Sequence, residues 1–137
     1  MTNRSAERIG RALVLLVSTF LITDGFIQIA SPPFLVTALT HIGFPPQAGP
    51  AIAVVTLTCA LLLAARVTAP FGALLTTAFL GGAICAHVRI GEIGSPPQLL
   101  CLILGAALWG GLVLSDYRVR ALLAPRRGVD GYWSAEV

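Results

Sequence analysis

The chain has 137 residues, of which 56% are hydrophobic and only 11% are charged. A soluble domain usually carries about 25% charged residues, so this chain has too little polar surface to cover a water-soluble particle. The composition therefore excludes a soluble globular protein and predicts one integral membrane domain over residues 1–137. The net charge of +3 comes from arginines spread among the loops and ends, a pattern that does not predict nucleic-acid binding.

Four long apolar runs follow one another along the chain, at about residues 10–30, 50–65, 69–90 and 99–114. Because about 20 apolar residues cross a bilayer, each run predicts a membrane helix. The second and fourth runs are short and need snorkelling ends or a thinned bilayer. The predicted fold class is all-α, a transmembrane four-helix bundle, whose helices are bounded by prolines.

The first run begins after a cluster of arginines, as the apolar segment of a signal peptide would. However, the run continues past Asp24, and residues 28–30 make a poor cleavage site. We therefore expect a retained membrane helix.

The loop after the first run contains a predicted short helix at residues 34–42. Its apolar side chains share one face at helical spacing: Phe34, Leu35, Ala38, Leu39 and Ile42. Such a helix lies in the membrane interface or caps the mouth of the bundle. It is either a plain connector or a lid over a substrate.

Arginine placement predicts the orientation of the chain in the membrane. Arginines occur at the N-terminus, at Arg66 and in the tail at residues 115–137, whereas the loop at residues 31–47 has none. Cytoplasmic loops carry the excess of basic residues, so both termini are expected to be cytoplasmic. Abundant Ala, Leu and Gly, with arginine as the basic residue, indicate a bacterial genome rich in GC, hence a bacterial cytoplasmic membrane.

Asp24 is the one carboxylate inside the first apolar run. A carboxylate at membrane depth costs several kcal/mol unless it has a partner or a water-filled cavity, so Asp24 is read as a functional residue. Gln28 follows four residues later on the same helix face. His87 and Arg89 lie near the same end of the third run and are expected partners across the bundle. Asp24 and His87 are the catalytic candidates, as acid and proton carrier. The alternative is a structural pair.

Further binding candidates gather at the same predicted outer level. Arg89 and Glu92 are three residues apart and would otherwise form a surface ion pair of little energetic value. His41 lies in the outer loop and would otherwise be solvated. Cys85 and Cys101 lie at similar depth, which would permit a disulfide in an oxidising compartment. The cysteines lack metal-ligand spacing, and no metal site is predicted.

Small residues recur every four positions on the third and fourth runs. The residues are Ala73, Thr77, Gly81 and Cys85 on the third run, and Ala106 and Gly110, with Ala107 and Gly111, on the fourth. Such stripes let membrane helices approach closely and are predicted packing surfaces.

Several segments together carry a resemblance to a known family: Asp24-Gly25, Pro32-Pro33, Ile42-Gly43-Phe44-Pro45, Leu80-Gly81-Gly82-Ala83, His87-Val88-Arg89-Ile90-Gly91 and Asp116-Tyr117-Arg118-Val119-Arg120. From residue 11 to residue 125, the chain resembles the DoxX-like membrane proteins.

The resemblance implies a four-helix bundle and points to Asp24, His87 and Arg89. Some relatives are subunits of a thiosulfate:quinone oxidoreductase or partners of redox enzymes. The chain departs from the family at Gln28, where many relatives have lysine, so the in-helix ion pair to Asp24 is lost.

These observations leave three functions open. The first is a redox-associated component that binds a quinone or isoprenoid head group near the outer leaflet and works with a membrane redox partner. The second is a cofactor-free isomerase or hydrolase acting on a hydrophobic small molecule through Asp24 and His87. The third is a non-catalytic adaptor subunit or homo-oligomer. No cofactor is evident from the residues, apart from the quinone of the first hypothesis.

Overall fold

The computed structural model describes residues 4–123. These residues form six helices and contain no strand: α1 (Arg4–Ala30), α2 (Pro33–His41), α3 (Gly49–Ala64), α4 (Ala69–Arg89), α5 (Pro96–Ser115) and α6 (Tyr117–Leu123). The predicted all-α class is confirmed, and so is the short helix after the first run. Of the predicted tail, residues 124–137 lie outside the described part of the chain.

Three of the helices, α1, α4 and α5, are long and apolar enough to cross a membrane. The fourth, α3, has 16 residues, and at 1.5 Å per residue it reaches about 24 Å. Large apolar side chains point outward along all four helices, among them Phe26, Leu61, Leu74 and Ile103. An outer surface of this kind suits lipid, and the chain is a membrane protein.

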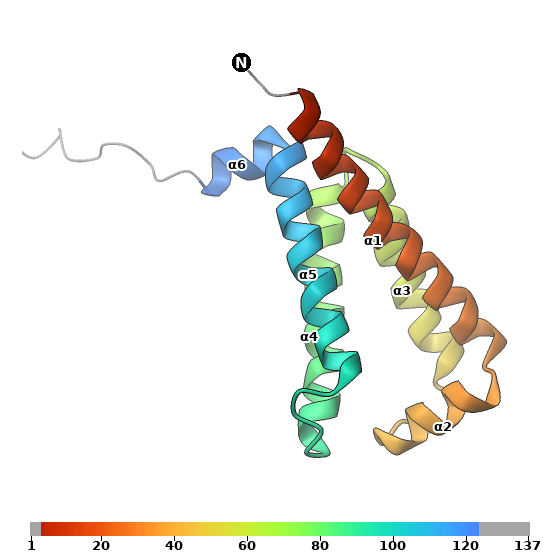
Figure 1. Cartoon of the computed structure of the whole chain (residues 1–137). Coiled ribbons are helices and arrows are strands. Elements are labelled where there is room, and N and C mark those ends of the chain that lie inside the picture. The colour runs from red at the N-terminus through yellow and green to blue at the C-terminus, as the bar shows by residue number, and fades with distance from the viewer. Residues whose placement is uncertain (1–3, 124–137) are drawn as a thin grey trace, which may run out of the picture.

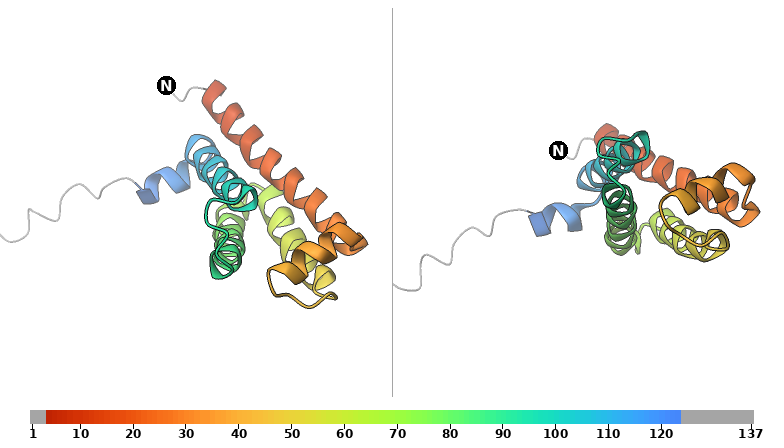
Figure 2. Two further views of the ribbon diagram at one scale, coloured as in Figure 1. Left: turned by 60° about the horizontal axis from the view of Figure 1, so that its bottom comes forward. Right: turned by 90° about the horizontal axis from the view of Figure 1, so that it is seen from below.

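The four long helices pack in a ring. α1 contacts α3 and α5, and α4 contacts the same two helices. Figure 1 shows the α1–α3 pair and the α4–α5 pair close together where α1 begins and α6 branches off, and apart where α2 crosses below. We call these the α6 end and the α2 end. The view from below in Figure 2 also shows α2 on the side of α1 and α3.

The buried core lies mainly toward the α6 end and the middle of the ring. It consists of aliphatic side chains from all four long helices, among them Val14, Val17, Leu21, Leu63, Ala73, Leu108 and Leu112. Buried residues recur every three or four positions along α1, because Val14, Val17 and Leu21 share one face of the helix.

Proline and glycine set the helix boundaries. Pro33, Pro50, Pro70 and Pro96 each stand in the first turn of a helix, where proline loses no hydrogen bond. Gly43 and Gly91 follow the ends of α2 and α4 with φ of 86° and 82°, a conformation that favours glycine. The first helix begins at Arg4, so it includes the polar residues that precede its apolar run.

Close helix contacts occur at several glycines, and near the α6 end they join α1 to α5 and α3 to α4. A Cβ atom on Gly10 would lie 2.5 Å from the carbonyl oxygen of Gly111, and one on Gly72 would lie 2.9 Å from the backbone of Leu62. Gly81 and Gly110, by contrast, face open space. The predicted packing stripes were therefore wrong at Gly81 and Gly110, whereas Gly111 does bring α5 against α1.

Candidate ligand-binding cavity

A large cavity lies between the two helix pairs at the α2 end. Its volume is about 710 Å³, and α1 to α5 all contribute to its wall. Most of the lining is apolar, including Phe20, Leu39, Val55, Phe79 and Leu104. Ionisable and amide side chains enter this wall at Asp24, Gln28, His87 and Cys101. A cavity of this size and polarity suits a drug-sized hydrophobic molecule with a small polar group.

Asp24 is half-buried in the cavity wall, and Gln28, one helical turn later, forms a hydrogen bond with its carboxylate. The Gln28 amide nitrogen donates to Asp24 Oδ2 over 2.5 Å and lies 3.4 Å from Thr56 Oγ1 on α3. The Thr56 hydroxyl donates its own proton to the Ile52 carbonyl oxygen over 3.0 Å, so its oxygen can only accept from Gln28. The two acceptors fix which way the Gln28 amide points.

This orientation leaves the Gln28 amide oxygen buried and without a hydrogen-bond partner in the described part of the chain. Gln28 is only 5% exposed, and a buried acceptor without a donor costs about 1–3 kcal/mol. The wall beside Asp24 therefore holds unused acceptor capacity that a donating ligand group, or water, would satisfy after a small side-chain adjustment.

The predicted pairing of Asp24 across the bundle was wrong. Within residues 4–123 no basic side chain forms an ion pair with Asp24, because His87 and Arg89 have other partners. Gln28 holds the carboxylate of Asp24 through an in-helix hydrogen bond. Thr56 was missed by sequence reasoning, since a lone threonine in an apolar run usually bonds only to its own helix.

His87 belongs to a chain of hydrogen bonds that leads out of the cavity. His87 Nδ1 lies 2.7 Å from Glu92 Oε2, and His41 Nε2 lies 2.8 Å from Glu92 Oε1. The side-chain exposure rises along this series, from 14% at His87 to 36% at Glu92 and 63% at His41. Three titratable groups thus connect the cavity wall to the solvent.

The same groups tie α2 to the α4–α5 hairpin. Arg89 donates from Nη2 to the Ile42 carbonyl oxygen over 2.6 Å, beside the Glu92–His41 contact. The Arg89–Glu92 ion pair expected from their spacing is therefore not what these side chains form. Hydrogen bonds from His87, and then from His41, hold the pKa of Glu92 below its usual range. Glu92 is thus a carboxylate that bridges two helices.

The two cysteines near this end are not bridged. Cys101 lines the cavity, Cys85 is exposed, and both are free thiols in the structure. Within the described residues no group of three His, Cys, Asp or Glu side chains is arranged to hold a metal ion.

The bundle and its cavity define a small helical membrane protein with an apolar pocket and a few polar groups. The model of the DoxX-like family matches residues 12–113, and the chain belongs to this family. No curated protein and no solved structure shows a significant match to the chain. The match covers α3 and α4, most of α1 and α5, and Asp24, Gln28, His87 and Cys101 of the cavity wall, but it carries no named substrate.

Proposed function

We propose that this protein binds a hydrophobic small molecule of the quinone type in the cavity at the α2 end, as a redox-associated membrane component. The observation that carries the proposal is the cavity itself, about 710 Å³ of mostly apolar wall with Asp24, Gln28 and His87 set into it. The apolar walls would hold the isoprenoid chain, and the polar side chains would hold the head group. We further propose that the α2 end faces outward from a bacterial cytoplasmic membrane, with both termini cytoplasmic.

The polar groups favour the reduced form of such a ligand. Asp24 offers carboxylate oxygens, and the Gln28 amide oxygen lacks a donor within residues 4–123. His87 uses Nδ1 toward the Glu92 carboxylate, so a neutral ring carries its proton there and keeps Nε2 as an acceptor. A hydroquinone donates two hydroxyl protons, whereas a quinone can only accept. The wall therefore matches the quinol better than the quinone.

The hydrogen-bonded series from His87 to His41 supplies a route for protons. Oxidation of a quinol to a quinone releases two electrons and two protons. In the proposal the electrons pass to a partner redox protein, and the protons leave through His87, Glu92 and His41 toward the solvent. The rise in exposure along this series gives the route its direction.

A second candidate function is a cofactor-free enzyme acting on a hydrophobic molecule. The specific observation in its favour is the His87–Glu92 pair, in which a carboxylate orients an imidazole at 2.7 Å. A histidine oriented in this way is a common general base, and Asp24 would then serve as the acid across the cavity. The identity of the bound molecule separates this candidate from the first.

The test is to purify the full chain and identify co-purifying lipids and quinones by mass spectrometry, for the native protein and for Asp24→Asn. Glu7→Gln is the matched control, because it also changes a carboxylate of α1 to an amide but lies outside the cavity. We expect a quinone or quinol in the native protein and in Glu7→Gln, and its loss in Asp24→Asn. A different hydrophobic molecule lost in the same way would favour the enzyme.

A second variant guards against misfolding of Asp24→Asn. Gly82 lines the cavity, and a Cβ atom there would meet nothing within 4 Å, so Gly82→Phe should fill the space without disturbing the helix contacts. We expect this variant to melt like the native protein and to retain no ligand. A native protein that binds no quinone or other apolar molecule, even in a quinone-replete membrane, would refute both candidates and leave an adaptor.

A further inference from the structure

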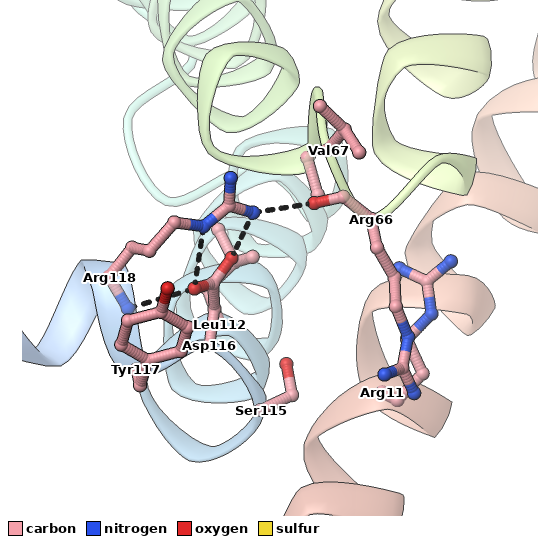
Figure 3. A pocket seen from close by; sticks show the side chains of 9 residues that line it. Arg11, Arg66, Val67, Leu112, Ser115, Asp116, Tyr117 and Arg118 are labelled. Carbon is pink, nitrogen blue, oxygen red and sulfur yellow. Dashed lines mark hydrogen bonds and ion pairs between the residues drawn. The ribbon is translucent and has the colours of Figure 1, made fainter.

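A second cavity lies at the opposite, α6 end of the bundle (Figure 3). Its volume is about 280 Å³, and its wall includes Arg11, Arg66, Val67, Ser115, Tyr117 and Arg118. Helices α1, α4, α5 and α6 and the α3–α4 turn meet there. Three guanidinium groups, from Arg11, Arg66 and Arg118, thus surround one small space.

One of the three arginines is neutralised inside the pocket. Arg118 donates from Nη2 and Nε to the two carboxylate oxygens of Asp116, over 2.8 and 3.1 Å. The same Nη2 also donates to the Arg66 carbonyl oxygen over 2.8 Å. The hydrogen bonds from Arg118 hold the pKa of Asp116 below its usual range, so this pair stays ionised and contributes no net charge at neutral pH.

The other two arginines have no carboxylate partner among the described residues. Arg11 donates to the carbonyl oxygens of Leu63 and Ala64, the last residues of α3, where a cation complements the helix dipole. The Arg66 side chain forms no hydrogen bond or ion pair within residues 4–123, and its charge lies close enough to repel that of Arg11. Figure 3 shows the two guanidinium groups together on the same side of the pocket.

Two neighbouring guanidinium groups without a counter-ion are unfavourable unless an anion joins them. The Ser115 hydroxyl donates to the Gly111 carbonyl oxygen over 2.7 Å, so it adds no donor to the pocket. The strongest available donors are the guanidinium groups of Arg11 and Arg66, whose planar shape suits the paired oxygens of phosphate. We propose that the pocket at the α6 end binds a phosphate or phosphodiester anion between Arg11 and Arg66.

The position of the pocket determines which phosphates can reach it. It lies where α3 and α5 end and α4 begins, and its rim includes Val67 and Tyr117, which are 79% and 73% exposed. Tyrosine and apolar side chains at the ends of membrane helices lie at the level of the lipid head groups. Both a phospholipid head group and a free phosphate could enter at this level, and they share the same recognition chemistry.

The test measures anion binding by the full chain, purified in a neutral detergent. Native mass spectrometry would count bound phosphatidylglycerol for the native protein, Arg66→Gln and Arg8→Gln, with zwitterionic phosphatidylcholine as the reference lipid. Arg8→Gln is the matched control, because it removes one exposed arginine of the same end that lies outside the pocket. Inorganic phosphate is then added to each as a competitor.

We expect Arg66→Gln to bind phosphatidylglycerol about tenfold more weakly, because one charge-assisted contact is lost, and Arg8→Gln to change binding less than about twofold. Displacement by millimolar inorganic phosphate would identify free phosphate as a ligand, and retention against it would identify the lipid head group. Equal weakening by the two variants, or none in either, would overturn the proposal.

A thermal measurement separates binding from folding. Without added anion, Arg66→Gln should melt at or above the temperature of the native protein, since it relieves the repulsion with Arg11 and removes no hydrogen bond of the Arg66 side chain within residues 4–123. Phosphatidylglycerol should then raise the melting temperature of the native protein and of Arg66→Lys, but not of Arg66→Gln. A rise of equal size in all three would contradict a site at Arg66.

Discussion

The two ends of the bundle differ in both packing and charge. At the α6 end the helices converge on Gly10, Gly72 and Gly111, with backbones in direct contact. At the α2 end they diverge, Gly82 faces open space, and the gap is a cavity of about 710 Å³. Glycine in a membrane helix therefore has two uses in one chain, because Gly10 permits close approach of α1 and α5 whereas Gly82 leaves room in the cavity wall.

The charges follow the same division. The wall at the α2 end presents the acceptor Asp24, with the buried Gln28 amide oxygen beside it, whereas the pocket at the α6 end presents donors, in Arg11 and Arg66. The two ends thus suit opposite ligands. One suits a hydrophobic molecule with hydroxyl groups, and the other suits an anion.

The largest expected effect on stability is at the converging end. Gly10→Ala should lower the free energy of unfolding by about 1–3 kcal/mol, because the new methyl group would meet the Gly111 backbone and push α1 from α5. Gly82→Ala is the matched control, and it should be neutral or gain about 0.5–1 kcal/mol from helix propensity. Thermal melting in detergent measures both, and equal losses would remove the distinction between the two ends.

A smaller effect is expected at the junction of α5 and α6. Asp116 Oδ1 accepts from the Arg118 backbone nitrogen over 2.9 Å, which caps α6, and the same carboxylate pairs with the Arg118 side chain. Asp116→Ala should cost about 1 kcal/mol, and Asp116→Asn less, because asparagine also caps helices. Melting curves at neutral pH compare the two variants. A larger loss in Asp116→Asn would show that the capping contact is unimportant.

The smallest effect is the pH dependence of the contact that ties α2 to the α4–α5 loop. The pKa of Glu92 is lowered in the folded chain, so its stabilisation is present above the usual glutamate value of about 4.3 and is lost as pH falls through the lower folded value. The native protein should therefore melt above Glu92→Gln at neutral pH, and the difference should close below pH of about 4. Glu7→Gln, whose carboxylate forms no ion pair within residues 4–123, should show no such difference at any pH.

Sequence reasoning found the residues of the cavity more readily than their contacts. Asp24, Gln28 and His87 were singled out because polar groups are costly in apolar runs, and all three line the cavity. The shared face of Asp24 and Gln28 was predicted correctly, but the pairing of Asp24 with His87 or Arg89 was not, because depth along a helix does not give rotation about its axis. His87 therefore meets Glu92 rather than Asp24. The pocket at Arg11 and Arg66 was not predicted, since the arginines were read only as markers of orientation.

The sequence alone determined the apolar segments of the chain and the residues at which its long helices begin. The length of the apolar runs and the prolines at their ends determine how many long helices form and where they begin, because the bilayer and the backbone impose those limits locally. Which faces meet depends on contacts between residues far apart in the chain, such as Gly10 with Gly111 and His41 with Glu92. Only the tertiary structure could decide these contacts, because small differences in helix rotation and tilt determine whether a glycine closes a contact or opens a cavity.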